Sequence, residues 1–384
     1  MSEWWVDDTQ LKGNQSDVLD VELDRNLGIF GPPGSGKTNL MMLRANHLHI
    51  AENPEFYVVT YTALLAQFIR RGASQYAFPV NKIITQTKLF ETVLGDHGKS
   101  IQRNPGETFI QYQDRLFNAM TSLIGSGKGI DSFPALFIDE GQDYSPNQLQ
   151  VFKALAKNVT IAADVRQGIY AADAGVKEYI HEHCDPVITL IHHFRTGRNI
   201  LKVADKIMDG KFDHVSMLDT SQYPEDTNKS TVEVENPCSL EEQTDKAISR
   251  LIKQLKFFPD ELFGVLVPRK AELALVWERM KNIPGLIGKV TNTRDPDFDP
   301  SLPIWLSTIH AAKGLEFRCV HILSAEHISR FNDKARRLAF TGVTRAKTSL
   351  AIYHQDELLP FLAAALKPGA TEGVKRHQLF GKKL

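Results

Sequence analysis

The run Gly31-Pro32-Pro33-Gly34-Ser35-Gly36-Lys37-Thr38 has the residue types and the spacing needed to hold a nucleoside triphosphate. Its glycines let backbone N–H groups converge on phosphate oxygens, Lys37 supplies a cation for the β- and γ-phosphates, and Thr38 offers a hydroxyl to Mg²⁺. The pattern predicts ATP or GTP as a ligand. The residues expected to contact the nucleotide here are Gly34, Ser35, Gly36, Lys37, Thr38 and Asn39.

The neighbouring segments have the order that a phosphate loop requires. Residues 26–30 are predicted to form a short buried strand, and residues 39–50, with apolar side chains at helical spacing, are predicted to form a helix. A glycine-rich turn between a strand and a helix N-terminus directs backbone N–H groups at an anion. We therefore interpret the run as a phosphate-binding loop rather than as an ordinary Gly/Pro turn.

A second candidate half-site follows the apolar strand predicted at residues 134–138, which ends in Asp139-Glu140. Carboxylates at the C-terminal end of a parallel strand face the ligand crevice. We expect Asp139 to hold the Mg²⁺ that Thr38 also binds, and Glu140 to orient or deprotonate the attacking water. Together the two motifs predict hydrolysis of the nucleotide rather than its storage.

The composition is that of a globular protein with two ordinary α/β domains, because 42% of the 384 residues are hydrophobic and 24% are charged. Three dispersed cysteines predict neither a disulfide framework nor a metal site. The N-terminal residues lack the apolar run of a signal peptide, and no segment approaches the ~18 apolar residues of a membrane span. We expect a cytoplasmic protein with no membrane partner.

Strand-like runs alternate with helical patterns along the chain, which predicts an α/β fold with a doubly wound parallel sheet in each half. The domain boundary is expected at 185/186, where a helix ends and a proline restarts the chain in an extended conformation. Residues 1–185 would form the first domain, with a small helical insertion at about 95–130, and residues 186–366 the second. Residues 367–384 are interpreted as a basic, flexible tail.

Residues 136–145, LFIDEGQDYS, resemble the Walker B motif of superfamily 1 helicases, whose UvrD/Rep group carries Asp-Glu-x-Gln-Asp. Other helicase motifs have similar counterparts, in the same order, between residues 11 and 347. The resemblance implies two RecA-like domains with an ATP site in the cleft between them. It also implies an ATP hydrolase of the DNA helicase or translocase type that uses Mg²⁺.

Five further segments resemble helicase motifs, and the resemblance implies which of their residues contact the nucleotide. They resemble the Q motif (residues 11–15), motif III (163–170), motif IV (193–195), motif V (307–317) and motif VI (341–347). By this resemblance Gln15 would read the adenine edge, Phe194 would stack on adenine and Glu316 would meet the ribose. Gln167 would sense the γ-phosphate, Arg195 would reach it, and Arg345 would be a second arginine finger. The catalytic set implied in this way is Lys37, Glu140, Gln167, Arg195 and Arg345.

Two motifs imply contacts with nucleic acid. Residues 58–62 are similar to motif Ia, which in the family touches a single strand, and motif V contributes a histidine. The residues assigned to this role are Thr60, Tyr61, Thr62 and His310. The expected partner is single-stranded DNA, with RNA as an open alternative. A formal net charge of −1 gives no global signature of polyanion binding, although a local groove can still be basic.

The chain departs from the family pattern in two places. The large insertion usual in the second domain is replaced by a helix and a short loop, so the resemblance is to a compact form. After motif III, Ala171-Ala172-Asp173-Ala174 stands where the family commonly shows an aromatic residue and an arginine that engage a base. One stacked base is worth ~1–3 kcal/mol, so the loss of this stacking platform weakens the grip on the strand. ATPase chemistry is therefore better supported than processive unwinding.

The leading hypothesis is an ATP-dependent translocase or helicase that moves on single-stranded DNA in the 3′ to 5′ direction, as the resemblance implies. The alternative is a regulatory or DNA-sensing ATPase subunit of a repair, mobile-element or phage-defence assembly, with little unwinding of its own. Such a protein could act with a protein partner such as a nuclease.

Overall fold

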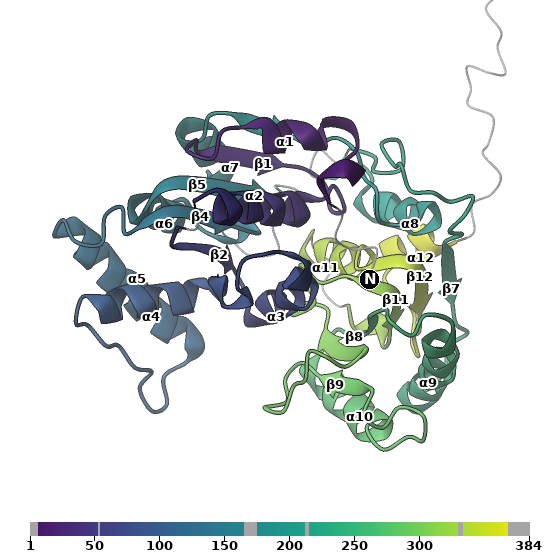
Figure 1. Cartoon of the computed structure of the whole chain (residues 1–384). Helices are drawn as coiled ribbons and strands as arrows, with labels where there is room; N and C mark the ends of the chain where they lie inside the picture. The colour runs from purple at the N-terminus through teal and green to yellow at the C-terminus, as the bar shows by residue number, and fades with distance from the viewer. Residues whose placement is uncertain (1–6, 53, 165–174, 212–214, 329–332, 368–384) are drawn as a thin grey trace, which may run out of the picture.

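A computed structural model of the chain describes residues 7–52, 54–164, 175–211, 215–328 and 333–367. Within this part the chain forms two six-stranded sheets, and the paired strands run parallel. Helices cover both faces of each sheet (Figure 1). The predicted fold class, two doubly wound parallel-sheet domains of the RecA-like kind, is confirmed.

The first sheet has the strand order β3-β2-β4-β5-β1-β6. Its strands are β1 (Leu27–Phe30), β2 (Phe56–Thr60), β3 (Ile83–Thr85), β4 (Phe133–Ile138), β5 (Ala156–Ala163) and β6 (Val187–Thr189). The helices of this domain are α1 (Ser16–Asp20), α2 (Lys37–Glu52), α3 (Ala63–Gly72), α4 (Gln86–Asp96), α5 (Phe109–Gly125), α6 (Pro146–Leu155) and α7 (Val176–His183). Because β1 and β4 both flank β5 and run parallel to it, the segments that follow them emerge at the same edge.

The second sheet has the order β7-β12-β11-β8-β10-β9. Its strands are β7 (Thr231–Val234), β8 (Phe263–Val267), β9 (Val290–Asn292), β10 (Ile304–Thr308), β11 (Phe317–Ile322) and β12 (Ala346–Ile352). One face packs against α8 (Arg198–Met208), α11 (Asp333–Val343) and α12 (Pro360–Leu366), and the other against α9 (Leu240–Phe257) and α10 (Lys270–Met280). Strands buried on both faces read as near-continuous apolar runs, as β8 does.

The first sheet has a hydrophobic core on each of its two faces, and the side chains of β1 alternate between them. Leu27 and Ile29 of β1 point to the face covered by α1, α2 and α3, whereas Phe30 joins the core under α4 to α7. Such alternation is the period of two that a strand imposes on its side chains. Both faces are therefore apolar along β1, and all four of its residues are buried.

The structure assigns β6 to the first sheet, where it pairs with β1 over residues 187–189. The chain thus crosses to the second domain after Thr189, beyond the boundary expected at 185/186. β6 is a three-residue edge strand without a fully buried residue. A strand of three residues is too short for its sequence pattern to predict which of the two sheets it joins. Of the tail expected at 367–384, only Lys367 lies within the described residues.

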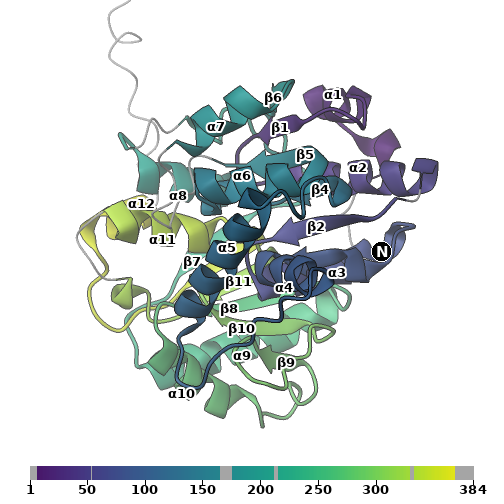
Figure 2. The same ribbon diagram turned by 90° about the vertical axis from the view of Figure 1, so that its left-hand side faces the viewer.

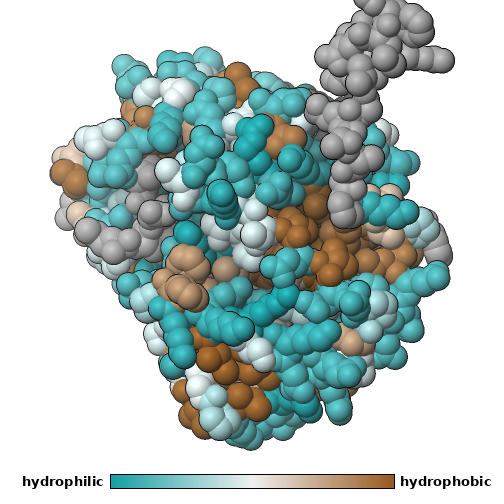
Figure 3. Space-filling model, turned by 90° about the vertical axis from the view of Figure 1, so that its right-hand side faces the viewer, coloured by the Kyte–Doolittle hydropathy of each residue, from teal (hydrophilic) through white to brown (hydrophobic). Residues whose placement is uncertain are grey.

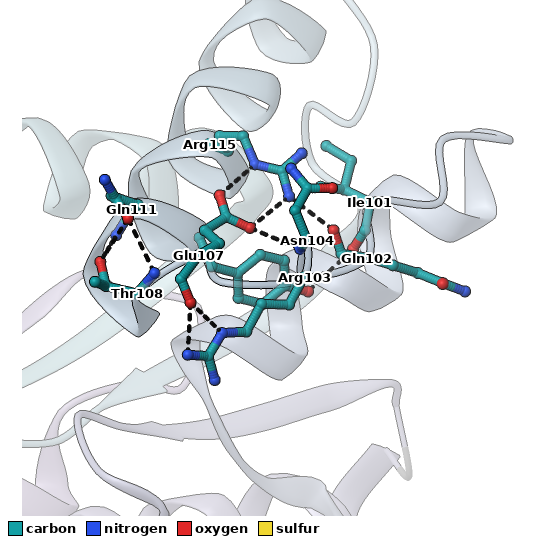
Figure 4. Close-up of polar contacts among 9 residues, drawn as sticks. Ile101, Gln102, Arg103, Asn104, Glu107, Thr108, Gln111 and Arg115 are labelled. Atoms are coloured by element: carbon teal, nitrogen blue, oxygen red, sulfur yellow. Dashed lines mark hydrogen bonds and ion pairs between the residues drawn. The ribbon is translucent and has the colours of Figure 1, made fainter.

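Helices α4 and α5 pack against each other at one end of the first domain (Figure 2). The loop between them closes around Glu107, whose carboxylate accepts hydrogen bonds from the backbone N–H of Asn104 at 2.9 Å and from Arg115 Nε at 2.7 Å (Figure 4). Arg103 donates to the Glu107 carbonyl oxygen. Hydrogen bonds from Arg115 and Asn104 lower the pKa of Glu107. α5 lies inside the region 95–130 in which a helical insertion is expected.

The second sheet exposes β7 as an edge strand. Val234 of β7 is 42% exposed, and apolar side chains gather on the face of the molecule where β7 lies (Figure 3). Charged side chains accompany it, since Arg250 pairs with Glu233 at 2.6 Å and also with Glu235. Charges along an edge strand disfavour pairing with another chain.

In the described part of the chain, no helix has the length and apolarity needed to cross a membrane.

Helix α3 of the first domain packs against the second domain. Its side chains Leu64 and Phe68 pack against the core of the second domain, with the Phe68 and Trp305 ring centroids 6.4 Å apart. Arg71 of α3 donates to the carbonyl oxygens of Pro300 at 2.7 Å and Leu302 at 2.9 Å. Because α3 follows directly on β2, the first-domain segment at residues 58–62 is continuous with an interdomain contact.

Arg71→Ala is expected to increase the population of molecules with separated domains, because it removes both hydrogen bonds from α3 to the second domain. The distance between a dye on α5 and a dye on α10, measured by fluorescence energy transfer, should lengthen. Arg70→Ala is the matched control, since among the described residues Arg70 donates to the Ile83 carbonyl oxygen, which lies within the first domain. The same distance in wild type and Arg71→Ala would show that this contact does not hold the domains together.

Candidate active site

The loop between β1 and α2 requires glycine at two positions. Gly34 has φ of 80° and Gly36 has φ of 91°, values that other residues rarely adopt. A Cβ atom on Gly34 would lie 2.6 Å from Cε1 of His193, and one on Gly36 would lie 2.6 Å from Nε2 of Gln15. Neither position has room for a side chain. The loop is thus held between the upstream Gln15 and the later segment around His193.

The loop presents groups suited to phosphate. Lys37, the first residue of α2, donates from Nζ to the carbonyl oxygens of Gly31 at 2.8 Å and Pro32 at 3.0 Å. Ser35 is fully buried, and its Oγ has no hydrogen-bond partner within the described residues. A buried polar atom normally has a partner, so an orphaned hydroxyl beside a helix N-terminus fits an anionic ligand. The loop therefore carries groups that could bind a phosphate.

Thr38 and Asp139 form a pair suited to Mg²⁺. The Thr38 hydroxyl donates to Asp139 Oδ2 at 3.0 Å, across the edge of the first sheet. Burial and the charge of Glu140 raise the pKa of Asp139 to about 7. A buried carboxylate with a raised pKa is stabilised by a cation, and oxygen ligands are those that Mg²⁺ prefers. The described residues hold no cluster of three or more His, Cys, Asp or Glu side chains arranged for a metal.

Glu140 follows β4 in a left-handed conformation, with φ of 52°. Burial tends to raise its pKa, but the positive charges of Lys313, Lys37 and Arg345 outweigh that effect and lower it. The carboxylate therefore stays ionised near neutral pH, as a group that orients or deprotonates water must. A Cβ on Gly314 would lie 3.2 Å from Glu140 Oε1, so the second domain approaches this carboxylate closely.

Two arginines of the second domain line a cavity that also contains the phosphate loop and the Glu140 carboxylate. Arg345 is 3% exposed and is fixed by hydrogen bonds to the carbonyl oxygens of Thr341 at 3.0 Å and Leu315 at 3.1 Å. Arg195 forms an ion pair with Glu316. Burial and the charge of Arg345 lower the pKa of Arg195 to about 9. The cavity is lined by Pro33, Gly34, Gly36, Lys37, Thr38, Asp139, Glu140, Asp164, Arg195, Gly314, Glu316 and Arg345.

A second cavity of about 250 Å³ continues from the first, because Gly34, Gly36 and Arg195 line both. Phe194 and Tyr223 give it aromatic lining, and Gln15, Asn39 and Lys12 give it polar lining. Most of the other lining residues are polar or charged, and the two aromatic rings beside the phosphate loop make this cavity a candidate base-binding pocket. Tyr223 lies outside every recognised motif, and no signal in the sequence pointed to it.

Gln15 and Asn39 make hydrogen bonds of their own in this pocket. Gln15 Nε2 donates to the Ser35 carbonyl oxygen at 2.8 Å, and its Oε1 accepts from the Lys12 backbone N–H at 2.9 Å. Asn39 Oδ1 accepts from the Tyr76 hydroxyl at 3.0 Å. Gln15 thus supports the phosphate loop directly, in addition to lining the pocket where a base would lie.

The segment at residues 193–195 is docked on the phosphate loop. His193 is fully buried; its Nδ1 contacts the Pro33 carbonyl oxygen and its Nε2 accepts from the Thr196 backbone N–H at 3.0 Å. Burial lowers the pKa of His193 to about 4, so the ring is neutral. The Phe194 backbone N–H donates to the Gly34 carbonyl oxygen at 3.2 Å. The contacts of His193 position Phe194 and Arg195, a role that the sequence did not reveal.

The residues expected at nucleic acid have different environments. Thr60 is fully buried and its hydroxyl donates to the Thr62 carbonyl oxygen at 3.1 Å, while the Thr62 side chain caps α3 by accepting from the Leu65 N–H. Tyr61 is half-buried, with its ring 5.3 Å from that of Tyr144 in an edge-on arrangement. His310 is exposed. The expected γ-phosphate sensor Gln167 and residues 171–174 lie outside the described residues.

Residues 303–353 match the family model of the UvrD-like helicase C-terminal domain. Among solved structures, the C-terminal domain of a possible DNA helicase from Lactobacillus plantarum WCFS1 is 20% identical, with a TM-score of 0.32 over 44% of this chain and 92% of that one. The PRRSV helicase is 14% identical, with a TM-score of 0.40 over 88% of this chain and 54% of that one, so the chain spans about half of its length. No curated protein matches the sequence. The family match is confined to residues 303–353, a stretch of the second domain that includes Glu316 and Arg345.

Proposed function

We propose that the protein is an ATP hydrolase of the UvrD/Rep-like group, in a compact form, that moves on single-stranded DNA in the 3′ to 5′ direction. One observation carries the proposal. A single cavity contains the phosphate loop, the Thr38 and Asp139 pair, the Glu140 carboxylate and two arginines from the other domain. Such an arrangement suits phosphoryl transfer, in which catalysis is almost entirely positioning and charge stabilisation.

Each group has a distinct role in the proposed reaction. The loop N–H groups and Lys37 bind the phosphates, and Thr38 and Asp139 would hold Mg²⁺. When bound, Mg²⁺ neutralises charge on the β- and γ-phosphates. Glu140 orients the attacking water and accepts its proton. Arg195 and Arg345 stabilise the negative charge that develops on the transferred phosphoryl group.

The two-domain origin of the cavity supports coupling of hydrolysis to motion. Lys37 and Glu140 belong to the first domain and Arg345 to the second, so the catalytic set is complete only while the domains are together. A single strand bound across both domains would be moved as the cleft opens and closes. DNA is the proposed strand, RNA is the alternative, and a nuclease is the kind of protein partner that would use such a motor.

Arg345→Ala and Arg195→Ala are each expected to lower kcat by about 10³-fold while the Kd for ATP changes little, because an arginine that acts on transition-state charge contributes mainly to kcat. Steady-state kinetics and titration with a fluorescent ATP analogue separate the two effects. Arg279→Ala serves as a control from the same domain, because Arg279 pairs with Asp245 and lines neither of the two cavities. Full activity in both single variants would exclude an active site built from two domains.

Strand movement is tested with duplexes that carry a single-stranded tail on one end. The proposal predicts ATP-dependent displacement of a short strand from a 3′-tailed DNA duplex and not from a 5′-tailed one. Displacement from the 5′-tailed substrate alone would overturn the proposed direction. No displacement from either, with DNA-stimulated hydrolysis intact, would leave translocation without unwinding or a DNA-sensing ATPase as the function.

A further inference from the structure

Gln142 ties the Glu140 carboxylate to the end of β5. It lies in the short turn η5 (Gly141–Asp143) that follows Glu140, and its side chain is 1% exposed. Its Nε2 donates to Glu140 Oε2, and its Oε1 accepts from the Asp164 backbone N–H at 2.8 Å. Both ends of the amide are therefore used, and neither bond goes to the phosphate loop.

The turn that carries Gln142 is fixed against the sheet. The Asp143 N–H donates to the Glu140 carbonyl oxygen at 2.8 Å, which closes the turn. A Cβ atom on Gly141 would lie 2.7 Å from the Ile161 side chain and 3.2 Å from the Ala162 carbonyl oxygen of β5. The turn thus has no room to shift toward the strand, and Gln142 spans a fixed distance between Glu140 and Asp164.

The opposite side of the turn is held by the second domain. Asp143 forms an ion pair with Lys313, and the two side chains are only 2% and 3% exposed. Gly314 follows Lys313 and lies close to Glu140 Oε1. The η5 turn is consequently fixed by β5 on one side and by the other domain on the other. Of the two carboxylate oxygens of Glu140, Gln142 holds Oε2 while Oε1 faces the second domain.

We infer that Gln142 is a positioning residue for hydrolysis, which holds the Glu140 carboxylate in the orientation that activates water. The inference rests on the proposed ATP hydrolase activity. Without the amide, Glu140 Oε2 loses its hydrogen-bond donor and the carboxylate can rotate away from the nucleotide. Small misplacements of a catalytic group can cost on the order of 10²-fold in rate. Nucleotide binding is maintained, because the phosphate loop does not depend on Gln142.

The test uses two variants of the full chain. Gln142→Met keeps the length of the side chain and removes both hydrogen bonds, whereas Gln142→Glu keeps an acceptor for the Asp164 N–H, removes the donor to Glu140 and adds a like charge beside it. Each is expected to lower kcat by about 10- to 100-fold, with the Kd for an ATP analogue within twofold of wild type. Gln113→Met, a substitution of the same kind on α5, should leave both values unchanged.

A double variant separates positioning from folding. Adding Gln142→Met to Glu140→Gln should lower kcat no further, because the group that Gln142 positions is already lost. A fall of kcat in Gln142→Met that multiplies with that of Glu140→Gln, or an unchanged kcat in Gln142→Glu, would overturn the inference. If Gln142→Met does not fold, the neutral variant Gln142→Leu takes its place in the same measurements. Absence of ATP hydrolysis in the wild-type chain would instead overturn the proposed function.

Discussion

Lys37→Ala is expected to lower ATP turnover by about 10³-fold or more, to the limit of detection in a phosphate-release assay. Lys37 is the cation at the start of α2, and it lines the cavity together with Thr38, Asp139 and Glu140. Its removal leaves the β- and γ-phosphates without their main charge partner as negative charge develops in the transition state. The affinity for ATP should fall as well, because the same charge acts in the ground state.

The control for this variant is Lys99→Ala, which removes a lysine from the loop between α4 and α5 and leaves the net charge of the two variants equal. Circular dichroism and thermal melting should show that both variants fold. Substantial turnover by a folded Lys37→Ala protein would mean that the loop at residues 31–38 does not bind the reacting phosphates.

Glu140→Gln is expected to keep ATP binding and to lose about 10²- to 10⁴-fold in kcat, since the amide preserves the shape of the side chain and cannot accept a proton. The carbonyl oxygen of the new amide can still accept the hydrogen bond from Gln142, so the local packing should persist. Single-turnover hydrolysis and titration with a fluorescent ATP analogue measure the two effects separately. Hydrolysis at the parental rate would show that Glu140 is not the water-activating group.

Much of the fold and the centre of the site could be predicted because they are local in sequence. The phosphate loop lies between an apolar strand and a helix, and Asp139 and Glu140 end a second apolar strand, so their types and order predict where they lie. The parallel sheets then bring both segments to one edge. The structure places Thr38 within hydrogen-bond distance of Asp139, as a shared metal site requires.

Contacts between distant segments could not be predicted in this way. The ion pair between Arg195 and Glu316 joins residues that the family resemblance assigned to separate tasks, the γ-phosphate and the ribose. Tyr223 reaches the base pocket from a loop with no motif, and His193 supports the phosphate loop through its ring. Such contacts depend on the path of the chain through the second domain, which residue patterns along a strand or helix do not encode.

The nucleic-acid contacts were predicted from resemblance alone, and the structure distinguishes among them. Thr60 and Thr62 use their hydroxyls within the protein, at β2 and at the start of α3. Tyr61 is half-buried and His310 is exposed, so both stay candidates for contact with a base or sugar. Patterns of residue type do not separate a threonine that caps a helix from one that meets a ligand.

The most direct test of the account is the steady-state ATPase rate of the wild-type chain, measured without nucleic acid and with saturating single-stranded DNA or RNA of equal length. The account predicts measurable Mg²⁺-dependent hydrolysis that single-stranded DNA stimulates severalfold, with Lys37→Ala inactive under every condition. Stimulation by RNA alone would change the identity of the strand. Hydrolysis that neither nucleic acid changes, or no hydrolysis at all, would contradict the claim that this cavity belongs to a nucleic-acid motor.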